Sequence, residues 1–120
     1  AHIVEVLCED AKDAYLAWLR SAGISYIFAG SKEMDLSLAL SKLRSLFNIR
    51  TLLLEGGSVL NGAFAREGLI DELSLVTAPV TADPDDLPLL SKSSIHSWNL
   101  ESVSDHSGIL VSKYSKQKDC

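Results

Sequence analysis

The residues with the clearest chemical potential stand together in one run, Leu52-Leu53-Leu54-Glu55-Gly56-Gly57-Ser58-Val59-Leu60-Asn61. An apolar segment leads into a carboxylate, a pair of glycines and the start of a predicted helix. Glycines let a backbone approach a phosphate closely, and the free N–H groups at the positive end of a helix then face that phosphate. The carboxylate can hold a hydroxyl or an amine of a second ligand. The run therefore predicts a nucleotide site beside a substrate site, although a tight turn also uses glycine for purely steric reasons.

The block from Leu54 to Val80 resembles the C-terminal reductase domain of riboflavin biosynthesis, the RibD-type pyrimidine reductase. In that family a Glu-Gly-Gly, a helix with a Leu-Asn-like pair, a Gly-Leu-Val-Asp-Glu-Leu and a strand ending in Pro-Val follow one another. Each has a counterpart here, in the order Glu55-Gly56-Gly57, Leu60-Asn61, Gly68 to Leu73 and Pro79-Val80. The segment from Tyr26 to Gly30, with Asp35-Leu36 after it, is also similar to the family.

The chain departs from the family pattern after Val80. The family has a glycine-containing stretch there, whereas this chain has Thr81-Ala82-Asp83-Pro84. Because of this departure, the resemblance does not extend to the loop on the substrate side.

The resemblance implies an NADPH-dependent reductase that acts on a ribosylated aminopyrimidine, of the 5-amino-6-(5-phosphoribosylamino)uracil reductase type. It implies that Glu55 binds the substrate. The cofactor-binding residues that it implies form one continuous segment: Gly56, Gly57, Ser58, Val59, Leu60, Asn61, Gly62 and Ala63. No catalytic side chain is assigned, because hydride transfer is the chemistry of the nicotinamide and the protein mainly positions its two partners.

Several of these residues also have structural interpretations. Ser58 is equally a helix N-cap, and Leu60 is expected to pack in the core rather than to touch the cofactor. Asn61 is polar on a first helical turn where alanine would serve. Lys32, just after Gly30, is the best candidate to meet the 2′-phosphate of NADPH.

Two other functions stay open. The first keeps the fold and the cofactor but changes the substrate, for example to a pterin. The second is a non-catalytic fragment whose exposed apolar face serves dimerisation, since an open sheet edge needs a cover. The resemblance itself implies a homodimer.

Composition narrows the class of protein. A chain of 120 residues with 47% hydrophobic and 22% charged residues is typical of one globular domain. A net charge of −5 argues against nucleic acid as a partner, because there is no basic stripe to neutralise phosphates. Apolar runs are too short for a membrane span. Cys8 and Cys120 lack metal-like spacing, which favours a reducing, cytoplasmic setting.

The acidic clusters do not predict a metal site. Asp71 and Glu72 are neighbours entering a strand, so their side chains point to opposite faces and cannot easily share an ion. Asp83, Asp85 and Asp86 lack the ligand spacing and central glycine of a calcium loop. A solvated loop is the better interpretation of that acidic segment.

Hydrophobic periodicity predicts alternating strands and helices. Strands are expected at 2–8, 25–29, 50–54 and 72–79, helices after Asp10, after Asp35 and at 59–67, and a hairpin at 98–104 and 108–114. Gly23 and Gly68 are expected to end helices. The unbroken Leu52-Leu53-Leu54 predicts a central strand covered on both faces.

This pattern predicts an α/β fold, a mixed sheet with parallel βαβ units and a C-terminal antiparallel hairpin. It fits the dihydrofolate-reductase-like fold that the resemblance implies. The family carries further strands ahead of the point where this chain begins. We therefore expect residues 1–120 to be one domain that lacks the family's N-terminal strands.

Overall fold

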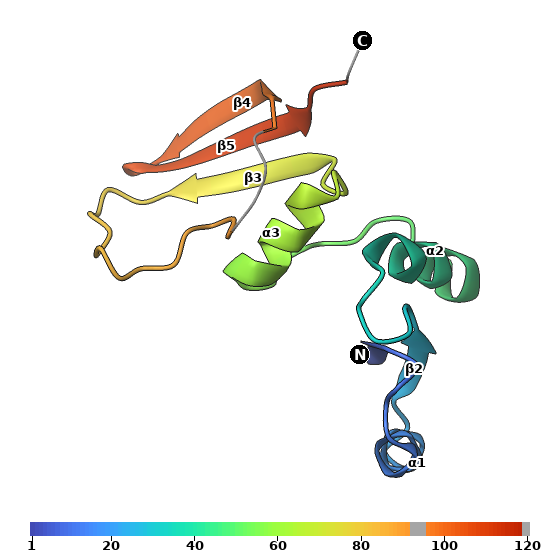
Figure 1. Cartoon of the computed structure of the whole chain (residues 1–120). Helices are drawn as coiled ribbons and strands as arrows, with labels where there is room; N and C mark the ends of the chain where they lie inside the picture. The colour runs from blue at the N-terminus through green and yellow to red at the C-terminus, as the bar shows by residue number, and fades with distance from the viewer. Residues whose placement is uncertain (92–95, 119–120) are drawn as a thin grey trace. The chain divides into compact units, whose positions relative to one another are not determined.

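A computed structural model describes residues 1–91 and 96–118. Cys120, which entered the prediction of a reducing setting, lies outside the described residues. The chain divides into two compact units, residues 1–53 and 54–120, each with its own sheet (Figure 1). The expectation of one domain stays a prediction. The expected ingredients of the fold, a parallel βαβ unit and a C-terminal antiparallel hairpin, are both present.

The first unit is built on a parallel βαβ arrangement. Its elements follow the order β1 (Val4–Leu7), α1 (Asp13–Ser21), β2 (Ser25–Phe28) and α2 (Leu36–Phe47). Strands β1 and β2 pair in parallel, with Val4 opposite Ser25 and Leu7 opposite Phe28. The first two predicted strands and the first two predicted helices are therefore confirmed.

The C-terminal end of α1 was predicted correctly, but its N-cap was not. At its C-terminus the Gly23 amide bonds the Arg20 carbonyl and the Ile24 amide bonds the Leu19 carbonyl. This is the double closure that a glycine just past a helix allows, as predicted. At the N-terminus the predicted cap was wrong, because Lys12 occupies the N-cap and the Asp10 amide instead donates to the Ser31 carbonyl.

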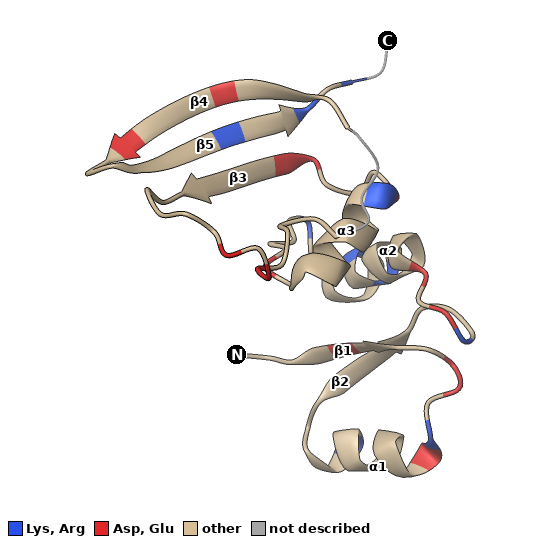
Figure 2. Cartoon of the chain, turned by 60° about the vertical axis from the view of Figure 1, so that its left-hand side comes forward, with Lys and Arg blue, Asp and Glu red and all other residues tan. Residues whose placement is uncertain are grey.

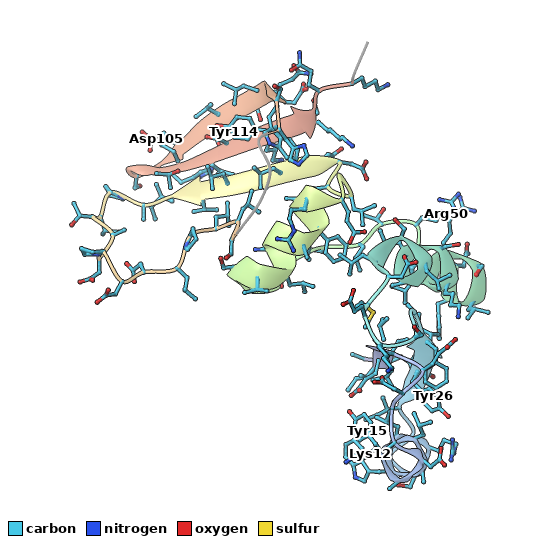
Figure 3. The ribbon with its side chains drawn as sticks, in the orientation of Figure 1. Lys12, Tyr15, Tyr26, Arg50, Asp105 and Tyr114 are labelled. Atoms are coloured by element: carbon cyan, nitrogen blue, oxygen red, sulfur yellow. The ribbon has the colours of Figure 1, made fainter. Side chains whose placement is uncertain are left out.

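Helix α1 buries only part of its apolar side chains. Leu19 is fully buried, but Trp18 is 54% exposed and stacks on Tyr15. Two hydrogen bonds also tie the helix to the strands. The Tyr15 hydroxyl donates to Glu5 at 2.7 Å, and Arg20 donates to the Tyr26 hydroxyl at 2.6 Å. Both tyrosines are labelled in Figure 3. Helical periodicity showed which residues share a face, but it could not show how much of that face is covered.

Helix α2 matches its prediction closely. The Asp35 side chain accepts a hydrogen bond from the Leu38 amide at 2.8 Å and so satisfies one of the N–H groups that a helix start leaves unpaired. Leu36 and Ala39 are buried, and Leu40, Leu43 and Phe47 of the same stripe are half-buried.

The strand predicted at 50–54 is not present. Residues 51–57 form neither helix nor strand, and Leu52 and Leu53 are 46% and 78% exposed. An apolar run indicates a tendency to be buried, but a strand also needs a hydrogen-bonding neighbour. None of the strands described in the two sheets pairs with this segment. The expectation of a central, doubly covered strand was therefore wrong for this structure.

The second unit combines one helix with an antiparallel sheet. It contains α3 (Ser58–Arg66), β3 (Glu72–Thr77), β4 (Trp98–His106) and β5 (Ile109–Lys116), with strand order β3-β5-β4. The predicted hairpin is confirmed as β4 and β5. Its two-residue turn, Ser107-Gly108, has positive φ at both positions, as a twisted hairpin requires.

Helix α3 lies against one side of this sheet (Figure 1). Phe64 and Ala65 are buried, and the Lys116 ammonium of β5 donates to the Gly68 carbonyl just past the helix at 2.8 Å. Leu73 and Leu75 alternate with exposed neighbours on β3. The sheet therefore has one apolar side, and the helix is held near the β3 start of that side with its own N-terminus open to ligands.

Candidate functional site

The first turn of α3 offers unpaired backbone donors. Gly57 is the N-cap and its carbonyl accepts the first helical bond, from the Asn61 amide at 3.0 Å. The N–H groups of Ser58, Val59 and Leu60 have no acceptor within the helix, as at any helix start. Since a glycine N-cap has no side chain to satisfy them, these donors and the positive end of the helix dipole can bind an anion.

The surroundings of Gly57 leave room for such an anion. Its φ of −60° and ψ of 171° suit any residue, and a Cβ placed on it would have no atom of the described structure within 4 Å apart from its chain neighbours. Neither backbone strain nor packing therefore requires glycine at this position. An open backbone surface beside unpaired N–H groups is what close approach of a phosphate needs.

Glu55 and the glycine pair together form the turn into α3. Glu55 is exposed and stands two residues before the N-cap, so its carboxylate is available to a ligand. The predicted N-cap role of Ser58 was wrong, because Gly57 holds that position and Ser58 is the first helical residue. The core position expected for Leu60 was also wrong, because this side chain is 44% exposed.

The other predicted cofactor residues lie on a second side of the helix. The Asn61 amide nitrogen donates to the Leu89 carbonyl at 3.3 Å. Gly62 is buried, and a Cβ on it would overlap the Ser91 carbonyl oxygen. Ala63 is half-buried. The structure thus brings the whole segment 56–63 to one helix start but distributes it over different sides.

The loop after β3 is acidic and closes on itself. The Asp83 amide donates to the Asp86 side chain at 2.7 Å, and the Asp85 amide donates to the Asp83 side chain at 3.0 Å. All three are exposed, in agreement with the prediction of a solvated loop (Figure 2). Throughout residues 1–91 and 96–118, no group of three or more His, Cys, Asp or Glu side chains could hold a metal ion.

In the first unit, the carboxyl ends of β1 and β2 carry two loops that are joined to each other. The Glu9 amide donates to the Gly30 carbonyl at 3.0 Å. Gly30 has a φ of +103°, and a Cβ there would overlap the Glu33 carbonyl oxygen, so this turn requires glycine. Lys32 lies exposed in the same turn. Its proposed contact with a 2′-phosphate stays a prediction.

Lys42 makes a contact in this unit that the sequence did not predict. The Lys42 ammonium on α2 donates to the Phe28 carbonyl at the end of β2, at 2.6 Å. It fixes the strand end from which the Gly30 turn departs. A single lysine among serines and leucines gives no signal of such a contact.

Two further observations concern the ionisation of Tyr15 and the length of the helices. The pKa of Tyr15 is raised, first by its hydrogen bond to Glu5 and then by burial and the negative charge of Glu5. No helix in the described part of the chain is both long and apolar enough to cross a membrane.

Solved structures of similar shape define the fold. A pyrimidine reductase-like protein from Corynebacterium diphtheriae matches with a TM-score of 0.80 and 24% identity, over 97% of this chain and 50% of that chain. Acinetobacter baumannii RibD matches with a TM-score of 0.74 and 21% identity, over 84% of this chain and 29% of that chain. At these identities the likeness concerns the fold alone. It confirms the expected class, a mixed α/β fold of the dihydrofolate-reductase-like type.

The family follows from the sequence match. The model of the RibD C-terminal domain matches residues 3–100, and the chain belongs to this family. It is also 38% identical over 72 residues to the 2,5-diamino-6-ribosylamino-4(3H)-pyrimidinone 5′-phosphate reductase of Methanothermobacter thermautotrophicus. That match covers 60% of this chain and 32% of the relative. The chain thus spans about a third of the curated relative that it matches.

Proposed function

We propose that this chain is part of a reductase of riboflavin biosynthesis that reduces a ribosylated aminopyrimidine 5′-phosphate with NADPH. The match to a curated pyrimidinone phosphate reductase supports the reaction and favours a pyrimidine over a pterin. The observation that carries the cofactor part is the start of α3, where an open glycine N-cap leaves backbone N–H groups unpaired.

The residues at this helix start fit a dinucleotide. The Gly56-Gly57 backbone and the N–H groups of Ser58 and Val59 would hold its pyrophosphate. Glu55 would bind the substrate through its exposed carboxylate. When bound, the nicotinamide would supply the hydride that reduces the sugar carbon attached to nitrogen. The protein contributes orientation and exclusion of water.

Two further properties belong to this proposal. The intact protein is a homodimer, supported by the exposed apolar residues Leu100 and Val103, which lie with Tyr114 on the apolar side of the sheet. It acts in the cytoplasm, where NADPH is available. The uracil and the 2,5-diaminopyrimidinone forms of the substrate differ only in the base, and both belong in the test.

The test is steady-state reduction by the intact protein, followed through the absorbance of NADPH with each of the two pyrimidine substrates and with a pterin. Glu55→Gln removes the proposed substrate carboxylate. Loss of a hydrogen bond to a charged group corresponds to about 1.5–3 kcal/mol, so we expect a rise in KM for the pyrimidine of roughly 10- to 150-fold. Glu67→Gln, at the exposed C-terminal end of α3, is the matched control and should leave KM unchanged. Turnover of a pterin alone would refute the proposed substrate class.

A further inference from the structure

One side of α3 is occupied by the backbone of the chain itself. The segment Leu89–Ser91, here called the strap, runs along the first two turns of the helix, where the loop after β3 returns (Figure 1). The Ser91 amide donates to the Ser58 carbonyl at 3.0 Å, and the Ser91 carbonyl accepts from Arg66 at 3.3 Å. The helical residues that meet the strap follow the spacing of a single helix face. They are Ser58, Asn61, Gly62 and Arg66.

Gly62 needs a physical reason, since it stands inside a helix. Glycine there is about 1 kcal/mol less favourable than alanine. The reason is the Ser91 backbone, which approaches so closely that a Cβ on Gly62 would overlap its carbonyl oxygen. Gly62 therefore makes room for the strap, and the space beside it is already filled.

Asn61 faces the same way. A backbone carbonyl only accepts hydrogen bonds, so the side-chain nitrogen of Asn61 must face Leu89, and this fixes the orientation of the amide. The remaining oxygen of Asn61 and the Ser58 hydroxyl are both buried without a hydrogen-bond partner among the described residues. These two polar atoms are withdrawn from solvent.

A different side of the same helix start is open. Val59 is 74% exposed, Leu60 is 44% exposed, and a Cβ on Gly57 would meet no atom of the described structure within 4 Å apart from its chain neighbours. A ligand can therefore approach the backbone at Gly57 from this side.

We propose that the two sides have separate roles in the reaction proposed above, on which this inference rests. The nucleotide pyrophosphate binds on the open side, at Gly57 and Val59. Asn61 and Gly62 are positioning residues that hold the strap. They do not contact the nucleotide.

The experiment measures two quantities on the intact protein, namely the dissociation constant for NADPH and the hydrogen-exchange rate of the Ser91 amide. Asn61→Ala and Gly62→Ala should speed exchange at Ser91 about tenfold or more, because they release the strap locally. The dissociation constant should change less than about threefold, which is below 1 kcal/mol. Asn61→Gln, which keeps the amide donor, should restore part of the protection.

Val59→Glu tests the other half of the proposal, namely that the nucleotide binds on the open side. A carboxylate in the first turn suits the helix dipole, so folding is preserved, but its charge opposes a phosphate. It should weaken NADPH binding at least about fivefold and leave exchange at Ser91 unchanged. A tenfold loss of affinity in Asn61→Ala with unchanged exchange would overturn the inference, because Asn61 would then bind the nucleotide directly. If the parent binds no NADPH, the proposed function and the nucleotide half of this inference both fail. The exchange rates would still decide whether Asn61 and Gly62 hold the strap.

Discussion

Gly57 permits a test in which charge is the only variable. Gly57→Asp and Gly57→Asn introduce side chains of the same size at the N-cap of α3, where the backbone angles suit both and no atom of the described structure stands in the way. Asp and Asn are about equally good N-caps, and both exceed glycine by only a few tenths of a kcal/mol. The fold should therefore accept both variants with equal or slightly higher stability.

The effect on binding should differ greatly between the two. A carboxylate in the cap accepts from the N–H group of Val59 or Leu60, and so competes with a phosphate for that donor. It would stand about 4 Å from a phosphate bound there. At that separation two unit charges repel by about 1 kcal/mol in a water-like medium and about 4 kcal/mol at an effective dielectric constant of 20. We expect NADPH to bind the Asp variant about 5- to 1000-fold more weakly than the Asn variant, with screening by salt favouring the lower part of that range.

The assay is titration of NADPH into the intact protein, followed by quenching of tryptophan fluorescence. Thermal unfolding of the two variants without ligand is the control for folding. Equal affinities of the Asp and Asn variants, within about twofold, would refute the reasoning, since a pyrophosphate at this helix start cannot be indifferent to a neighbouring charge. If those equal affinities were both weaker than that of the parent, the loss would come from the size of the new side chain and not from its charge.

Two other predictions concern stability and titration. Asp35→Ala removes the cap of α2 and should lower the free energy of unfolding by about 0.5–2 kcal/mol in urea denaturation, whereas Asp35→Ser, which still caps, should lose less. The second uses the raised pKa of Tyr15, caused first by its hydrogen bond to Glu5. Because the folded chain holds this proton more tightly than the unfolded chain, its contribution to stability is complete below the ordinary pKa of 10.0 and is lost as the pH rises through the folded value. Tyrosine absorbance should show an ionisation phase displaced above the ordinary pKa of 10.0, and this phase should vanish in Tyr15→Phe.

The features that were predictable from sequence depend on near neighbours. Asp35 caps a helix and Gly23 ends one through contacts within a few residues, and both were identified correctly. The β4–β5 hairpin was likewise predicted, because its two strands are joined by a short turn. The glycine-rich helix start was found for the same reason, since the chemistry of 55–58 lies within one turn.

The features that were missed depend on distant partners. Leu52 and Leu53 have the composition of a buried strand, but composition cannot supply the neighbouring strand that would pair with them. The strap meets Gly62 from 29 residues away, as Ser91. A glycine inside an otherwise regular helix was the available signal, and it indicates a close approach without saying what approaches.

The pairing of β3 has a consequence for synthesis on the ribosome. Leu75 of β3 pairs with Ser112 of β5, which follows it by 37 residues. At roughly 5–20 residues per second, β3 leaves the ribosome about 2–7 s before its partner does. During that interval its hydrogen-bonding groups are unpaired and its leucines uncovered, a condition that favours association between nascent chains. The Asp71-Glu72 pair at the head of β3 supplies charge where such association would begin, so the sequence carries a safeguard for the period before β5 arrives.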